Sequence, residues 1–372
     1  MSKILIFDKG GRNQRISLIK ENKAPKDFFQ SIDFLRTKNF NIDHLSSSIK
    51  YKRNLLVFIF RPFEEIFSIF SKIGIRPLSV FQFKEKINNA SYVVSLTDGF
   101  SLSLGFYYSF LNKKSKIKLA GGFHKLSDFL DNKPFLIKKF YYPIFKIILK
   151  RLNYLIFYGE ADRLNSIKYF KLDQEKTFTI KFGVDTDFWI PNEKNNFKSN
   201  YIFSIGQDPS RDFSTLLKVK TKRKIHIHTN LLYSSNNKKL KITNGTYQKY
   251  KNNYSDLKIR KLYQDSFLII VPLKNVFQPS GYSVTLQAMS CGKPVLLTKT
   301  KGLWAPSVFV SFKNCILVNP YNPQEIENAI KFLEDNEKIY KRISLNARKT
   351  AEKYFSLDVA NKSTFKIFKN FK

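Results

Sequence analysis

The chain has 372 residues, 43% of them hydrophobic, which is enough for two domains that each bury a core. Its 65 Lys and Arg against 29 Asp and Glu give a net charge of +36, which favours anionic partners, although the lysines are scattered and not clustered as in a nucleic-acid-binding arm. Apolar stretches are too short for a signal peptide or a membrane span, and Cys291 and Cys315 give neither a disulfide framework nor zinc spacing, so we expect a cytoplasmic protein with no nucleic-acid partner.

Short apolar runs alternate with helical segments in the first half of the chain. We predict strands at residues 3–7, 54–60, 92–96, 116–121, 154–158 and 177–184. A helix is expected over residues 100–112, whereas Pro143 is expected to interrupt any helix within residues 134–152. This alternation indicates βαβ units and a parallel sheet.

A second alternating pattern follows the polar stretch at residues 190–200, which contains Pro191 and is typical of an interdomain linker. We predict strands at residues 201–206, 224–228, 267–273, 294–298 and 315–319. After the last of these, Asn322, Pro323 and Glu325 form a capping box that begins a helix. Both halves are therefore predicted to be doubly wound, with ligands bound at the carboxyl ends of the strands.

The most informative segment runs from Gln278 to Thr298. The residues Gly281-Tyr282-Ser283 open a short predicted helix, and Gly292 is placed to end it in a left-handed conformation. A glycine at a helix start exposes backbone N–H groups at the positive end of the helix dipole, which suits a diphosphate. An ordinary loop, helix and strand without a ligand fits the same residues equally well.

This segment resembles the donor-binding motif of GT-B glycosyltransferases of the retaining family 4 (glycosyl transferases group 1), in which two glutamates eight positions apart precede Ala-Met-x-x-Gly-x-Pro-Val. Other segments resemble the same family in the same order, at residues 182–191, 204–212, 314–320 and 347–356. The resemblance extends from about residue 150 to the end. It implies the GT-B fold, with two Rossmann-like domains facing across a cleft at residues 1–190 and 191–372, and allows the last helix to return to the first domain.

The resemblance also implies a set of donor-binding residues in the second domain. They are Gln207, Arg211, Gln278, Ser280, Gly281, Tyr282, Ser283 and Gln287. The second motif glutamate is Gln287 here, and its amide can still hydrogen-bond a ribose diol without charge assistance. The first glutamate falls on Pro279, for which Gln278 or Ser280 would substitute. In the phosphate loop, Gln207 stands where the family has an arginine, and Arg211 matches the basic residue that follows. Arg211 is therefore the one side-chain cation of this loop that the resemblance assigns to the diphosphate.

In the first domain the resemblance implies a glycine loop after the first strand and an active-site histidine. Gly10 and Gly11 match the loop, although a plain turn explains them equally well. His124 matches the histidine that would touch the transferred sugar, and we favour this role over a solvent or cap histidine. Asp98 follows a strand and could bind an acceptor, but a simple turn is favoured.

Two further sets of residues have simple structural explanations. His226 and His228 alternate on one strand, and without a third ligand nearby we expect them on an exposed face and not at a metal site. Asp185 and Asp187 are expected to be structural caps. Residues 135–151 combine aromatic and aliphatic side chains with lysines, as in an interfacial membrane face, but a core helix with a solvated basic side fits as well.

We therefore predict a glycosyltransferase that moves a sugar from a nucleotide-sugar donor to a glycan or lipid-linked acceptor. Retention, the lack of a metal or other cofactor, and catalytic roles for His124 and Arg211 are implied by the resemblance. An anionic membrane surface at the inner face of the membrane is a further candidate partner. The alternatives are another GT-B enzyme, such as a nucleotide-sugar epimerase or a phosphorylase, an inactive relative, and a charge-driven binding protein.

Overall fold

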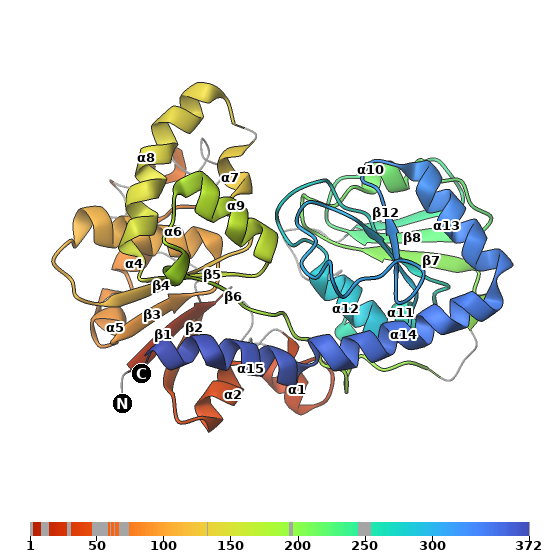
Figure 1. Ribbon diagram of the computed structural model, residues 1–372, viewed down its shortest axis with the longest axis horizontal. Coiled ribbons are helices and arrows are strands. Elements are labelled where there is room, and N and C mark those ends of the chain that lie inside the picture. Colours follow the sequence, from red (N-terminus) through yellow and green to blue (C-terminus); the bar gives the residue numbers. More distant parts are fainter. Residues whose placement is uncertain are drawn as a thin grey trace.

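The computed structural model of the chain describes residues 3–8, 15–27, 31–46, 59, 61–62, 64–66, 74–131, 133–192, 196–244 and 254–371. Two α/β lobes lie side by side, and the last helices run beneath both of them (Figure 1). Each lobe contains a six-stranded sheet in which every described pairing is parallel. This confirms the predicted fold class of two Rossmann-like α/β domains.

The sheet of the first domain has the strand order β2-β1-β3-β4-β5-β6. The strands are β1 (Lys3–Asp8), β2 (Asn41–Ser46), β3 (Tyr92–Ser95), β4 (Lys118–Phe123), β5 (Tyr154–Phe157) and β6 (Thr177–Thr179). The pattern of apolar runs predicted all of these except the edge strand β2. The strand predicted at residues 54–60 lies outside the described residues apart from Ile59.

The sheet of the second domain has the order β12-β11-β10-β7-β8-β9. The strands are β7 (Tyr201–Ile205), β8 (Lys224–Thr229), β9 (Leu240–Asn244), β10 (Ile269–Val271), β11 (Val295–Thr298) and β12 (Ile316–Val318). The edge strand β9 was not predicted. In both sheets the order reverses at the first strand, which leaves the carboxyl ends of the central strands open to a ligand.

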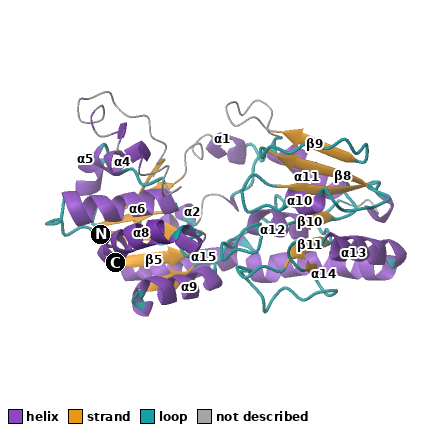
Figure 2. Cartoon of the chain, turned by 90° about the horizontal axis from the view of Figure 1, so that it is seen from above, coloured by secondary structure: helices purple, strands orange, loops and turns teal. Residues whose placement is uncertain are grey.

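Helices cover both faces of each sheet (Figure 2). In the first domain they are α1 (Arg15–Lys20), α2 (Ile32–Thr37), α4 (Pro77–Phe81), α5 (Lys84–Asn88), α6 (Asp98–Phe106), η2 (Tyr107–Leu111), α7 (Asp128–Asp131), α8 (Phe135–Arg151), α9 (Glu160–Phe170) and η3 (Gln174–Lys176). In the second they are η4 (Asn196–Lys198), α10 (Phe213–Leu216), α11 (Asp256–Asp265), α12 (Tyr282–Ser290), α13 (Pro323–Asp335) and α14 (Glu337–Phe355), followed by α15 (Leu357–Phe368) and η6 (Lys369–Phe371). The predicted capping box begins α13, since the Asn322 side chain accepts the N–H of Glu325 at 3.1 Å.

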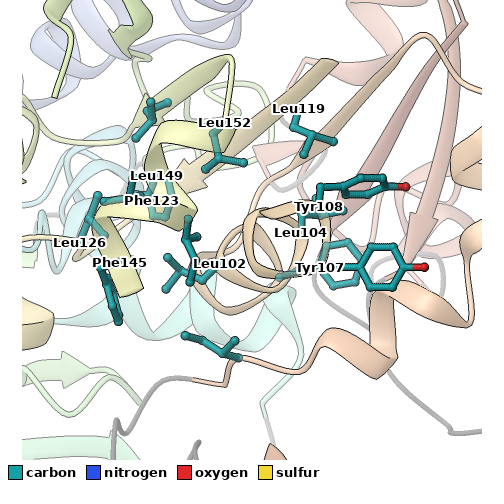
Figure 3. Close-up of a cluster of buried hydrophobic side chains, with 14 of the residues drawn as sticks. Leu102, Leu104, Tyr107, Tyr108, Leu119, Phe123, Leu126, Phe145, Leu149 and Leu152 are labelled. Atoms are coloured by element: carbon teal, nitrogen blue, oxygen red, sulfur yellow. The ribbon is translucent and has the colours of Figure 1, made fainter. Parts of the chain in front are cut away.

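The first-domain core lies between the sheet and the pair α6 and α8. Leu102 and Leu104 of α6 pack with Phe145 and Leu149 of α8, and all four side chains are buried (Figure 3). At Gly105 the two helices approach so closely that an added Cβ would lie 2.8 Å from the carbonyl oxygen of Ile148. The α6–α8 packing therefore depends on a residue without a side chain at this position.

The prediction that Pro143 interrupts a helix was wrong, because α8 is continuous from Phe135 to Arg151. Pro143 lies on the exposed side of α8. The neighbouring turns bury Tyr141, Phe145 and other apolar side chains in the core. This burial offsets the one backbone hydrogen bond that a proline removes from a helix.

The chain crosses between the domains twice. Ile180 belongs to the first-domain core and Phe182 to the second, so the first crossing lies a little before the predicted division at residue 190. The chain crosses back after Phe355, whose carbonyl accepts the N–H of Val184 at 2.8 Å where the two crossings meet. Helix α15 then packs beneath the first sheet, where Phe368 is buried with Ile4 and Ile6 of β1 (Figure 1).

Gly105→Ala should lower the free energy of unfolding by roughly 1–3 kcal/mol, because the new Cβ would overlap the backbone of α8. Alanine has the better helix propensity, so a net loss would isolate the steric effect. Gly74→Ala is a matched control, since a Cβ there would meet nothing within 4 Å. Urea denaturation that shows equal effects of the two substitutions would contradict the close packing.

Candidate active site

Helix α12 begins at a glycine with left-handed backbone. Gly281 is its N-cap with φ of 78°, and its carbonyl accepts the N–H of Thr285 at 2.9 Å to close the first turn. Gly292 has φ of 67° just after the helix, which confirms the predicted left-handed end. The N–H groups of the first turn have no partner within the helix, and they carry its positive dipole end. Such an end favours an anion.

Arg211 lies against this helix start and is 4% exposed. A Cβ on Gly281 would lie 3.2 Å from its Nη1, and a Cβ on Gly206, which follows β7, would overlap its Nε. Among the described residues, neither Nε nor Nη1 has a hydrogen-bond partner. Burial lowers the pKa of Arg211 to about 10, against the opposing charge of Asp208, so the side chain is still a cation at neutral pH. The predicted Arg211 and Gly281 therefore meet around a buried positive charge.

The other predicted residues of this region lie around the same loop. Gln278 donates from Nε2 to Oδ2 of Asp208 at 2.9 Å, and Ser280 is buried beside it. Burial alone would raise the pKa of Asp208, but hydrogen bonds from Ser210 and Gln278 lower it overall. Gln207 is exposed at the surface of the loop.

The loop that carries His124 follows β4 and is held by two aspartate side chains. Asp98 accepts the backbone N–H groups of His124 and Lys125 at 3.0 and 3.2 Å. Asp162, from α9, accepts the next two, those of Leu126 and Ser127, at 3.2 and 2.9 Å. Asp98 is thus an organiser of the loop.

His124 faces the second domain from this loop. Its ring stacks on Tyr158 with centroids 3.9 Å apart and lies 6.5 Å from the ring of Tyr282, the first residue of α12. Tyr282 also packs on Phe182, which lies where the chain first crosses between the domains, with ring centroids 4.2 Å apart. The structure therefore places two predicted site elements next to each other across the domains, His124 of the first domain and the start of α12 in the second.

Asp128 makes a direct contact between the domains. Its carboxylate accepts the backbone N–H groups of Phe277 and Gln278 at 3.0 and 2.6 Å. Gly159 lies against Pro279 so closely that a Cβ there would be 2.9 Å from the Cβ of the proline. Burial raises the pKa of Asp128, although these two hydrogen bonds oppose the shift. The loop before α12 thus rests on the first domain.

Gln287 is buried in α12, and both ends of its amide are engaged by protein groups. Its Nε2 donates to Oδ2 of Asp27 at 3.0 Å, and its Oε1 accepts from the hydroxyl of Tyr263 at 3.3 Å. A donor ribose at this residue would have to compete with Asp27 or Tyr263. The ribose contact stays a prediction.

Two histidines lie elsewhere than expected. His226 and His228 are buried on β8, where each ring nitrogen facing Thr243 lies within 3.1 Å of its hydroxyl, so the exposed face predicted for them was wrong. Thr243 lies on the neighbouring edge strand β9, and Tyr254, just before α11, stacks on the ring of His228 with centroids 4.2 Å apart. Neither β9 nor these contacts were predicted, which explains the error. Burial lowers the pKa of His226 to about 4, so the ring is neutral. No cluster of three metal-binding side chains occurs within the described ranges.

Some predicted residues cannot be placed, and some functional candidates were missed. Gly10 and Gly11 lie outside the described residues. Asp185 is a cap as expected, since its Oδ1 accepts the N–H groups of Asp187 and Phe188 at 3.3 and 3.2 Å. Asp27, Asp128 and Asp162 belong to no sequence motif, and only the tertiary structure shows what they contact.

Residues 233–350 match the family described as glycosyl transferases group 1. Among curated protein sequences, none matches the chain. The structure is similar to that of HepE from Anabaena in complex with UDP-glucose, at 15% identity over 100% of both chains with a TM-score of 0.64. It is also similar to sucrose-phosphate synthase from Thermosynechococcus elongatus, at 12% identity over 100% of this chain and 99% of that chain with a TM-score of 0.68.

A third similar structure is a glycosyltransferase from Rickettsia africae ESF-5, at 16% identity over 99% of this chain and 98% of that chain with a TM-score of 0.63. The likeness covers both domains together. At these identities it shows a common fold, the GT-B arrangement that the sequence predicted.

The stability of the chain should depend on pH through Asp162. Burial raises its pKa to about 7, although hydrogen bonds from Ser127 oppose the shift. Between its ordinary pKa of 3.8 and about 7, the folded chain keeps a proton that the unfolded chain has lost. The contribution of Asp162 to the free energy of unfolding is therefore fully present below pH 4 and falls by up to about 4 kcal/mol as the pH rises through 7.

Asp162→Asn removes this titration. The free energy of unfolding of wild type should therefore fall relative to that of the variant as the pH rises from 4.5 to 7.5. Urea denaturation across this range measures it. Asp33→Asn, at an exposed carboxylate, is the control and should leave the wild-type pH dependence in place. Parallel curves for wild type and Asp162→Asn would contradict the burial of a protonated carboxyl.

Proposed function

We propose that this chain, a glycosyltransferase of the GT-B fold, moves a sugar from a nucleotide-sugar donor to a glycan or lipid-linked acceptor. The group 1 glycosyl transferase segment supports transfer of a glycosyl group. The shared fold with HepE, which was solved with UDP-glucose, supports a nucleotide-sugar donor. The observation that carries the proposal is the buried Arg211 beside the start of α12.

The donor diphosphate would lie between Arg211 and the first turn of α12. When the bond between the sugar and the diphosphate breaks, the bonding electrons stay with the diphosphate, and its negative charge grows. A fixed cation and fixed N–H groups stabilise that charge without having to reorganise. Arg211 has two buried nitrogens without a hydrogen-bond partner among the described residues, so it can donate to phosphate oxygens at no loss of existing bonds.

His124 would face the transferred sugar from the first domain. Its backbone is fixed by Asp98 and its ring is fixed by stacking on Tyr158. It lies opposite Tyr282, so a sugar joined to a diphosphate at the helix start would extend toward it. We further propose transfer with retention and without a metal, as the family resemblance implies, with Arg211 offsetting the diphosphate charge.

The first domain, which would bind the acceptor, carries an exposed apolar face on α8, which we call the α8 face. Phe135, Leu136, Phe140 and Ile147 are 74%, 76%, 61% and 48% exposed. Leu136, Phe140 and Ile147 recur at i, i+4 and i+11, so they share one side of the helix. Phe110 and Leu111 of η2, which packs on α8, add to the exposed apolar surface.

Lysines border the α8 face. Lys139, Lys146 and Lys150 are exposed at i, i+7 and i+11, so they form a line beside the apolar one. None of the helices in the described residues is long and apolar enough to cross a membrane. An exposed apolar line beside a basic one fits an anionic lipid surface, and α8 follows α7, which carries Asp128 at the domain contact. We propose that the α8 face attaches the chain to the inner face of a membrane and brings a lipid-linked acceptor to the cleft.

Arg211→Ala should weaken nucleotide binding by on the order of 1.5 to 3 kcal/mol, as expected for the loss of a charged hydrogen bond. Calorimetric titration with UDP, GDP and ADP measures the effect. Arg342→Ala, at an exposed arginine of α14, is the matched control and should bind like wild type. Unchanged affinity of Arg211→Ala for every nucleotide that wild type binds would remove Arg211 from the donor site.

Replacing Lys138, Lys139, Lys146 and Lys150 with glutamate should release the chain from anionic vesicles. Each basic residue near such a surface contributes about 1 kcal/mol, and the attraction should weaken as salt is added. Co-sedimentation with phosphatidylserine-containing vesicles measures binding. The same substitution at Lys331, Lys338, Lys341 and Lys349 of α13 and α14 is the charge-matched control. If both variants lose binding equally, or neither does, the α8 face is not the attachment surface.

A further inference from the structure

The segment from Gln278 to Thr298 contains no acidic residue, yet two carboxylates contact it. Asp128 accepts the N–H of Gln278 at its start, and Asp27 accepts the side-chain N–H of Gln287 within α12. Both acids belong to the first domain, 150 and 260 residues away in the sequence. The first domain therefore holds this segment at its start and again near its middle.

Asp27 is buried, with 3% of its surface exposed, and accepts three hydrogen bonds. Its Oδ1 accepts the backbone N–H of Asp185. Its Oδ2 accepts from Nε1 of Trp189 at 2.8 Å and from Nε2 of Gln287 at 3.0 Å. The next bond runs in the other direction, since the N–H of Lys26 donates to Oδ2 of Asp185 at 2.9 Å. Asp27 is thus joined both to residues 185–189, which follow the first crossing between the domains, and to α12.

The groups that Asp27 contacts are fixed from behind. The carbonyl of Trp189 accepts from the Ser290 hydroxyl at 2.6 Å and from Nη1 of Arg348 at 2.8 Å, which ties it to α12 and α14. The other end of the Gln287 amide is held by Tyr263 of α11. A shift of Asp27 would therefore be passed to α12 and not absorbed by a loose side chain.

The contact between Asp27 and Gln287 costs more free energy than a purely structural link between the domains requires. A buried carboxylate loses its hydration, and the donors around Asp27 are neutral amide and indole groups, which offset only part of that loss. An apolar pair of similar volume would be expected to hold the two domains together at a lower cost. The carboxylate has one advantage over such a pair, because its hydrogen bonds fix the position and orientation of α12 relative to the first domain.

We propose that Asp27 is a positioning residue of the donor site: its carboxylate, supplied by the first domain, holds Gln287 and so keeps the start of α12 in place for the diphosphate. This inference depends on the proposed function, because it takes α12 as the donor helix. It follows that donor affinity depends on a contact between the domains and not on the second domain alone.

The test uses the full chain and four variants, Asp27→Asn, Gln287→Glu, the double variant that carries both, and Gln287→Met. Gln287→Glu places two carboxylates together in a buried position, whereas the double variant again pairs an amide with a carboxylate. Gln287→Met fills a similar volume and leaves Asp27 with its other two donors. Asp256→Asn is the control, because its ion pair with Arg15 also joins the domains but does not touch α12.

Calorimetric titration measures the Kd of whichever of UDP, GDP and ADP wild type binds, at a temperature where each variant is folded. Asp27→Asn, Gln287→Glu and Gln287→Met should each weaken binding by about tenfold or more, and the double variant should recover most of the loss of Gln287→Glu. Asp256→Asn should lower the unfolding temperature and leave Kd unchanged.

Wild-type affinity in Gln287→Met and Gln287→Glu would overturn the inference, and so would a double variant as weak as the product of its two single effects. Gln287→Met alone cannot separate the Asp27 contact from the predicted ribose contact, so the comparison of the double variant with Gln287→Glu decides the matter if Asp27→Asn does not fold. Equal weakening by Asp256→Asn would also overturn it, because any domain contact would then have the same effect. If wild type binds no nucleotide, the proposed function itself fails, which is a separate result.

Discussion

The left-handed backbone at Gly281 decides where α12 begins and what can lie beneath its first turn. A Cβ at this residue would come within 2.7 Å of Cγ1 of Val271 and 3.2 Å of Nη1 of Arg211. Gly206 leaves space on the other side of the same guanidinium. Two glycines therefore allow a buried cation to sit at the positive end of a helix, and both charges favour the same anion. The rest of the site is arranged around this position.

Aspartate side chains of the first domain organise the opposite wall of the site. Asp98 and Asp162 capture four successive backbone N–H groups and so fix the loop of His124. Asp128 and Asp27 extend the same principle across the domain boundary to the loop before α12 and to the helix itself. Burying these acids costs free energy, and in return each defines one arrangement of the backbone that it contacts. The relative position of the two domains is thereby built into the site.

The sequence predicted those parts of the structure that depend on local patterns. Central strands are buried on both faces, so their apolar runs were clear, whereas the edge strands β2 and β9 include Asp43, His44 and Lys241 and gave no such signal. The start of α12 at Gly281 and the cap at Asn322 follow from glycine and capping chemistry within a few residues.

What the sequence could not predict depends on contacts between distant residues. The two histidines of β8 were misplaced because their contacts with Thr243 and Tyr254 were not predicted. Pro143 was misjudged because packing on the core outweighs its local effect. Asp27 and Gln287 lie 260 residues apart, and neither residue type at its position indicates the other. Gln287 could be chosen as a site residue from the family resemblance, but its partner could not.

Thermal unfolding of the wild-type chain with UDP, GDP, ADP and dTDP in turn tests most directly whether the site binds a nucleoside diphosphate. We expect the diphosphate of one nucleoside to stabilise the chain more than the others do, by about 2.7 kcal/mol when this ligand exceeds its Kd 100-fold. Inorganic pyrophosphate should stabilise it less, because it lacks the nucleoside. If none of the four nucleotides at millimolar concentration raises the unfolding temperature of the folded chain, the buried Arg211 and the start of α12 do not form a donor site.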